Sequence, residues 1–104
     1  MTEPISIKYS AIYAKKGESI FISHLDIMSL FRRAMRRASL PFVLTKGFTP
    51  RVRISIPQAL KLGCESSREE MSFWLSEEVT PELLVDQINK ELPDGVRILE
   101  IEKI

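Results

Sequence analysis

One stretch of this sequence is crowded with arginine and holds an aromatic residue among its cations. The cations between residues 32 and 53, taken together with Phe48, are Arg32, Arg33, Arg36, Arg37, Lys46, Arg51 and Arg53. Guanidinium forks bind phosphate groups bidentately, and an exposed aromatic ring stacks on an unpaired base. This mixture is typical of single-stranded RNA recognition, so these residues are our candidates for nucleic-acid binding.

Acidic and basic residues are segregated along the chain. The formal net charge is only +1, but residues 27–64 hold eight bases and no acid, whereas residues 65–104 hold eleven acids and four bases. Such a dipolar molecule either steers a polyanion to one face or docks on a partner by charge complementarity. A solvated surface on which charges merely cluster is the plain alternative.

The acidic half also offers the arginines an internal partner. Like charges four residues apart weaken an isolated helix, so the arginine pairs at this spacing need a compensating anion. A bound polyanion would supply it, but so would Glu82 and Asp86 on a second helix packed beside the first. The sequence leaves both explanations open.

His24 is the only histidine, and Ser23 and Asp26 stand close to it. Residues two apart on a helix do not face each other, and both neighbours are suited to capping a helix start. A nucleophile needs a hydrogen-bonded base that is itself oriented by a third group. We therefore expect no catalytic residue and keep His24 as a candidate ligand contact, with a small-molecule or catalytic role around it as a further hypothesis.

Cys64 is the only cysteine. A single thiol excludes an internal disulfide, a zinc site built mainly on thiolates and a self-contained iron–sulfur cluster. The one histidine and the scattered carboxylates show no metal-ligand spacing either. We expect no metal and no cofactor. Whether the chain is an enzyme by itself is left open, and the sequence favours that it is not.

The same features predict a cytoplasmic protein. The lone cysteine fits a reducing compartment. No apolar run approaches the roughly 18 residues of a membrane span, and the first residues lack a basic-then-apolar leader. The length of 104 residues predicts one domain, residues 1–104, and leaves the oligomeric state open.

Alternating apolar residues predict the strands. The pattern runs through residues 5–13, continues with Val52, Ile54 and Ile56, and recurs at residues 71–75, where Trp74 faces away from its neighbours. Residues 42–44 are a short extended piece, 46–50 a loop and 57–67 a connection. A last strand covers residues 96–101, with a bulge at Leu99.

Two helices are predicted between these strands. The first begins at Ser23 and ends before Pro41. The second begins at Thr80, whose hydroxyl is suited to cap it, with Pro81 at its first position. The apolar stripe of the first helix is Leu25, Met28, Phe31, Met35 and Ala38, and that of the second is Leu83, Leu84, Ile88 and Leu92.

The resulting order is strand, helix, strand, strand, helix, strand. It predicts an α+β fold, a ferredoxin-like βαββαβ sandwich with a mainly antiparallel sheet and two helices on one face. The second face of the sheet would be open. Platforms of this kind bind RNA or a protein partner, although a fold does not by itself fix a function.

Three segments together carry a family resemblance: residues 21–26 (FISHLD), 31–38 (FRRAMRRA) and 46–50 (KGFTP). They resemble the radical-SAM-associated domain of unknown function, a bacterial family found alone or fused behind a radical SAM module. The resemblance implies a radical SAM protein as partner and a link to RNA processing or ribosome biogenesis. Members often carry Gln, Asn and His-Pro around the G-F-x-P loop, where this chain has Lys46, Thr49 and Arg51-Val52.

Two functions are therefore expected from the sequence. The first is a non-catalytic accessory domain that binds RNA through the basic helix and strand and is linked to a radical SAM protein. The second is a protein-interaction module that docks a radical SAM enzyme without binding RNA. The chain lacks the cysteine triad of the radical SAM cluster and would not cleave S-adenosylmethionine itself.

Overall fold

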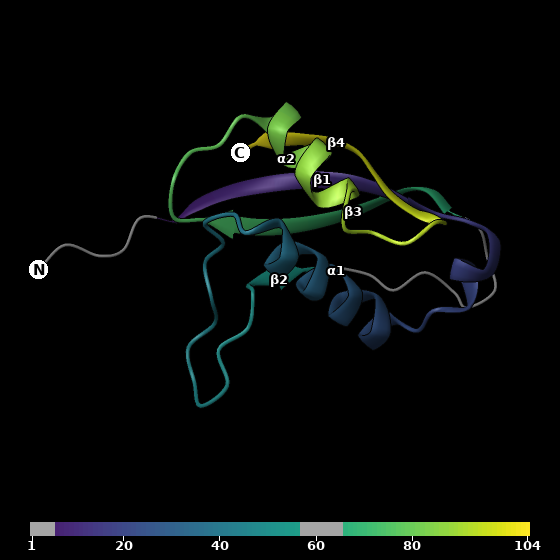
Figure 1. Ribbon diagram of the computed structural model, residues 1–104, viewed down its shortest axis with the longest axis horizontal. Helices are drawn as coiled ribbons and strands as arrows, with labels where there is room; N and C mark the ends of the chain where they lie inside the picture. Colours follow the sequence, from purple (N-terminus) through teal and green to yellow (C-terminus); the bar gives the residue numbers. More distant parts are fainter. Residues whose placement is uncertain (1–5, 57–65) are drawn as a thin grey trace, which may run out of the picture.

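The computed structural model describes residues 6–56 and 66–104. Its elements in chain order are β1 (Ile7–Lys15), the 3-10 helix η1 (Gly17–Phe21), α1 (His24–Ala38), β2 (Ile54–Ser55), β3 (Ser66–Leu75), α2 (Pro81–Asn89) and β4 (Val96–Lys103). The strands form one sheet in the order β2-β3-β1-β4, with antiparallel neighbours throughout (Figure 1). The α+β, ferredoxin-like fold is confirmed.

The core lies between the sheet and the helices. Tyr9 and Ala11 of β1 and Met71, Phe73 and Leu75 of β3 are fully buried. Residues between them on the same strands face the open side, because side chains alternate along a strand. Trp74 lies opposite the buried β3 residues, as its position in the alternation predicts.

Helix α1 buries Ile27, Phe31, Ala34 and Met35. It begins where the Ser23 hydroxyl accepts a hydrogen bond from the Asp26 amide at 3.2 Å, and it ends at the predicted place, with Ser39 in the left-handed region at φ 55°. The placement of Leu25 in the apolar stripe is wrong, because this side chain is 75% exposed. Leu25 precedes Ile27 by two positions, about 200° around the helix, and so faces away from the sheet.

Helix α2 begins at Pro81 after the N-cap residue Thr80, as predicted, but differs from expectation in its cap and on its surface. The Thr80 side chain makes no capping hydrogen bond. The Tyr9 hydroxyl fixes this end instead, because it donates to the Val79 carbonyl and accepts from the Val79 amide, each at 3.0 Å. Leu83 is 46% exposed and does not belong to the buried side, which Leu84 and Ile88 form.

The bulge predicted in the last strand is present. Ile12 pairs with Glu100 and its neighbour Tyr13 pairs with Ile98, so Leu99 is the extra residue. Asn89, at the end of α2, accepts from the Ile98 amide at 2.8 Å and donates to the Ile98 carbonyl at 2.9 Å. The side-chain amide of Asn89 therefore forms hydrogen bonds with both the backbone N–H and the backbone carbonyl of Ile98, next to the bulge.

The chain between α1 and β2 forms an irregular hairpin, residues 42–53. Phe42 bridges to Leu75 of β3, and Leu44 bridges to Val52 across the hairpin. Its tip projects away from the sheet (Figure 1). β2 is shorter than the alternation predicted, although Val52, Ile54 and Ile56 are all buried as expected.

The connection predicted for residues 57–67 is wrong at its end, because β3 begins at Ser66. The hydrogen bonds of β3 to β1 extend this far, since Ser66 pairs with Lys15. Residues 57–65 lie outside the described residues, as do Cys64 within that range and Ile5 of the first predicted strand.

Tyr13 gives the fold a dependence on alkaline pH. Its ring lies edge-on to Phe31 with the centroids 4.9 Å apart, and burial, aided by the nearby Glu69 carboxylate, raises the pKa of Tyr13 from 10.0 to about 12. As pH rises, the unfolded chain loses this proton before the folded chain does. The contribution of Tyr13 to stability is therefore complete below about pH 10 and is lost between about pH 10 and 12.

We predict that Tyr13→Phe removes this component of alkaline destabilisation. The measurement is the urea midpoint of variant and wild type at about pH 9 and about pH 11.5. The midpoint of the wild type should fall more between the two pH values than that of the variant. Equal falls in the two proteins would contradict the assignment.

Candidate nucleic-acid interface

Two arginines of α1 bind the hairpin through its backbone. The Arg32 Nε donates to the Val52 carbonyl at 3.1 Å, and a terminal nitrogen of Arg36 donates to the Pro50 carbonyl at 3.3 Å. Residues four apart lie on one face of a helix, so both reach the same segment. These bonds attach the hairpin to α1 and hold the two guanidiniums in place.

A hollow of about 300 Å³ lies between α1 and the hairpin, which we call the arginine hollow. Its lining residues are Ser29, Arg32, Arg33, Arg36, Thr49, Pro50, Arg51 and Val52. Four of these residues are cationic and two carry hydroxyls. The arrangement is suited to binding an oxyanion such as phosphate.

The arginine hollow keeps its positive charge in the structure. The ion pairs within residues 6–56 and 66–104 are Arg68–Glu100 at 2.8 Å and Lys103–Glu78 at 2.6 Å, and neither includes an arginine of the hollow. The internal neutralisation considered from the sequence, with Glu82 and Asp86 as partners, is therefore not seen in this part of the chain. Cations without a close carboxylate produce a positive local potential that attracts polyanions.

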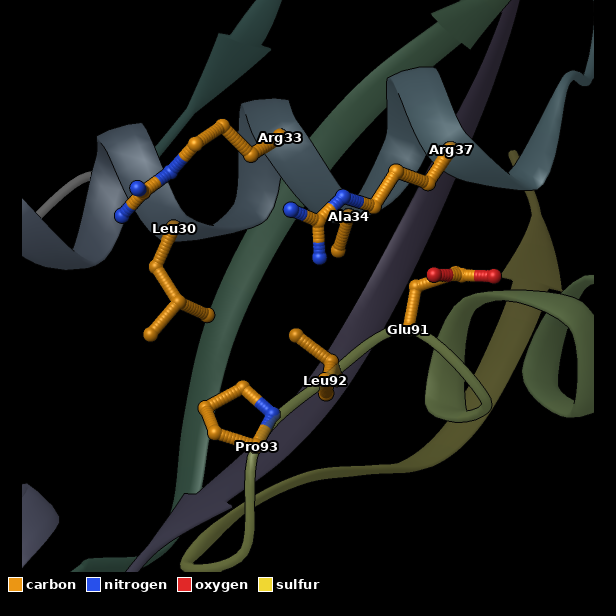
Figure 2. Close-up of a pocket in the computed structure, with 7 residues that line it drawn as sticks. All are labelled: Leu30, Arg33, Ala34, Arg37, Glu91, Leu92 and Pro93. Atoms are coloured by element: carbon orange, nitrogen blue, oxygen red, sulfur yellow. The ribbon is translucent and has the colours of Figure 1, made fainter.

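A second hollow of about 300 Å³, the docking hollow, lies on the other side of α1, between this helix and the end of α2. Figure 2 shows Leu30, Leu92 and Pro93 gathered below α1, with Arg33 and Arg37 along the helix and Glu91 across from Arg37. Arg33 lines both hollows. Of the two hollows, Arg37 lines only the docking hollow.

The remaining predicted residues lie elsewhere. Lys46 and the fully exposed Phe48 are in the projecting tip of the hairpin. The guanidinium of Arg53 lies over the Trp74 ring, 4.1 Å from its centroid, on the open face of the sheet. The predicted set is thus divided among the arginine hollow, the docking hollow, the hairpin tip and the open face.

The predicted binding residues did not include Ser29 and Thr49, which line the arginine hollow, or Lys8 and Trp74, which lie on the open face. Lys8 also lies over the Trp74 ring, 5.8 Å from its centroid. The alternation of β1 and β3 placed Lys8 and Trp74 on the open face, and this signal was available in the sequence. The pairing register that makes them neighbours was not.

His24 lies in the first turn of α1 and lines neither hollow. Its Nδ1 atom is buried and has no hydrogen-bond partner in the described structure. Within the same residues no group of three or more His, Cys, Asp and Glu side chains is arranged to hold a metal ion. No helix there is long and apolar enough to cross a membrane.

Residues 8–104 match the model of a family described as an uncharacterized protein conserved in bacteria (DUF2344). The match supports the coarser part of the resemblance, a domain of unknown function, and covers all the elements from β1 to β4 apart from the first residue of β1. Neither the curated proteins nor the solved structures contain a match to the chain.

Proposed function

The chain belongs to the bacterial family DUF2344, whose description assigns no activity, and from the geometry we propose that it binds RNA through the arginine hollow. The observation that carries this proposal is the convergence of Arg32, Arg33, Arg36 and Arg51 on one hollow where no described carboxylate pairs with them. Helical charges this close repel one another, and a phosphate backbone relieves the repulsion.

The hairpin carbonyls prepare two of the guanidiniums for this ligand. Arg32 and Arg36 each use a nitrogen on a backbone carbonyl and keep further N–H groups for phosphate oxygens. A guanidinium that is already held loses less conformational freedom when it binds. Phe48, at the tip of the same hairpin, offers an exposed ring for base stacking.

The proposed role is that of an accessory domain. By its resemblance to the radical-SAM-associated domain, the chain would bring RNA to a radical SAM protein that carries out the chemistry, in RNA processing or ribosome biogenesis. The arginine hollow provides cations and hydroxyls for binding. This donor set is suited to holding phosphate oxygens, which is the binding role that we propose.

The direct test is binding of a fluorescein-labelled single-stranded RNA of about 12 nucleotides, followed by anisotropy at low and moderate salt. Each phosphate contact on a single strand contributes about 0.7 to the salt slope, so about four contacts predict a loss of roughly 50-fold in affinity between about 50 and about 200 mM salt. Absence of binding at low salt, or affinity that does not change with salt, would overturn the proposal.

A second candidate function, docking of a protein partner, is favoured by the docking hollow. Its apolar residues, Leu30, Leu92 and Pro93, lie beside Arg33 and Arg37, which suits a segment with apolar and acidic side chains (Figure 2). By resemblance, the partner would be a radical SAM protein. A partner that co-purifies after nuclease treatment, and is lost when the exposed Arg37 is replaced by Glu, would favour this reading over RNA binding.

A further inference from the structure

The open face of the sheet carries a row of cations around one aromatic ring. Lys8 pairs with Trp74 across β1 and β3. Arg53 directly precedes β2, the other neighbour of β3, and its guanidinium carbon lies over the same ring, 4.1 Å from the centroid. Lys8 and Arg53 are exposed and Trp74 is half-buried. We call these three residues the stacking row.

A row of small hydroxyl side chains runs parallel to the stacking row. Ser72 of β3 pairs with Ser55 of β2 on one side and with Ser10 of β1 on the other. Directly paired residues of neighbouring strands have their side chains about 5 Å apart on one face. None of the hydrogen bonds between described residues uses these three hydroxyls, so they are available to a ligand lying against Trp74.

The part of the open sheet face that lies away from Trp74 is acidic. Ile12 of β1 pairs with Glu70 on one side and Glu100 on the other, and Ser10 pairs with Glu102 on β4. Arg68 of β3 is joined to Glu100 by an ion pair. A polyanion would therefore be accepted over the stacking row and repelled farther along the sheet.

The hairpin connects the stacking row to the arginine hollow. The Val52 carbonyl accepts from Arg32 of the hollow, while the next residue, Arg53, stacks on Trp74 on the other side of the sheet. Both surfaces are thus carried by neighbouring residues at the β2 edge. A flexible strand that crosses this edge contacts both.

We propose that the stacking row and its three serines bind unpaired nucleotides, so that single-stranded RNA is the ligand class of this protein. This inference rests on the proposed function. Trp74 and the guanidinium plane of Arg53 are surfaces on which bases stack, Lys8 meets phosphate, and the serine hydroxyls bind base edges or a 2′-OH. A duplex keeps its bases stacked inside and cannot use this row.

Trp74 is the only tryptophan of the chain, so its fluorescence reports on the stacking row directly. The experiment titrates the intact protein with a single-stranded RNA of about 12 nucleotides and with a duplex of equal length, following both Trp74 emission and the anisotropy of labelled RNA. Single-stranded RNA should quench the emission. The duplex should bind more weakly and leave the emission unchanged.

The matched variants are Ser72→Glu, which places a carboxylate beside Trp74, and Thr80→Glu, which adds the same charge at the exposed start of α2. Loss of one stacked base predicts about tenfold weaker binding for Ser72→Glu, and Thr80→Glu should bind like wild type. Circular dichroism confirms that both variants are folded before they are compared.

Each alternative outcome has a distinct meaning. RNA that binds by anisotropy without changing Trp74 emission, or binds Ser72→Glu as well as wild type, overturns the stacking row and leaves the arginine hollow standing. Absence of RNA binding overturns the hollow and the row together. Quenching by a glutamate-rich peptide and not by RNA overturns both in favour of a protein ligand.

Discussion

Replacement of Arg33, Arg37 and Arg51 together by glutamine is expected to weaken RNA binding about 100-fold at low salt. These three are chosen because their side chains donate no hydrogen bond to a described residue. Arg32 and Arg36, in contrast, attach the hairpin to α1. Arg33 and Arg51 line the arginine hollow, and Arg37 lies beside it, one helical turn from Arg33 on α1. The loss has an electrostatic cause, since each removed guanidinium takes away a contact to a phosphate at or next to the hollow. The measurement is RNA anisotropy, with the thermal midpoint as a check of folding.

A control variant removes three charges from other parts of the surface. Lys16, Lys90 and Arg97 are exposed, lie outside both hollows and are changed to glutamine in the same way. The control has the same net charge as the arginine variant and should bind RNA within a few-fold of wild type. Equal losses in the two variants would mean that net charge, and not the arginines in and beside the hollow, attracts the RNA.

Among the described glycines, Gly95 is the one whose replacement by alanine should destabilise the fold most, by about 3 kcal/mol. Gly95 precedes β4 at φ +93°, a conformation that favours glycine. A Cβ atom there would lie 2.6 Å from the Ser19 hydroxyl and 2.7 Å from the Lys16 carbonyl, both too close. The turn is held at this point, because the Lys16 amide donates to the Gly95 carbonyl at 2.8 Å and the Ser19 hydroxyl donates to the Asp94 carbonyl at 3.2 Å.

Gly17→Ala is the matched control for this substitution. Gly17 also has a positive φ, +65°, but a Cβ atom there meets nothing within 4 Å. The control should cost only about 1 kcal/mol, the cost of the left-handed conformation itself. Free energies of unfolding in urea give both values. A Gly95→Ala variant no less stable than Gly17→Ala would show that the close packing of η1 against this turn does not constrain the fold.

Local sequence patterns predicted the elements because burial on one face of a strand or helix repeats at a fixed period. The alternation in β3 correctly placed Phe73 inside and Trp74 outside. Leu25 was misplaced because its spacing from Met28 fits a helical stripe, whereas its position about 200° around α1 from the buried Ile27 leaves it exposed. The start of α2 was predicted correctly, since Thr80 is its N-cap residue and Pro81 its first residue, but the hydroxyl that fixes this end belongs to Tyr9, seventy residues away from Val79.

The sequence predicted which residues belong to the candidate site, but not how they are arranged in space. The cluster of arginines was visible in the sequence, and four of them do meet. Their division among several surfaces depends on long-range bonds, such as Arg32 to the Val52 carbonyl, which no local pattern encodes. The stacking of Arg53 on Trp74 likewise requires the register of β2 against β3, in which Ile54 pairs with Phe73.

The measurement that tests the central claim most directly is the salt dependence of RNA binding for wild type and for the Arg33, Arg37 and Arg51 variant. If these arginines contact phosphates, the slope of log Kd against log salt should fall by about two units in the variant, since each contact contributes about 0.7. The variant that keeps the hollow and loses Lys16, Lys90 and Arg97 should retain the slope of wild type. An unchanged slope in the arginine variant would contradict the account and place the RNA on another surface of the protein.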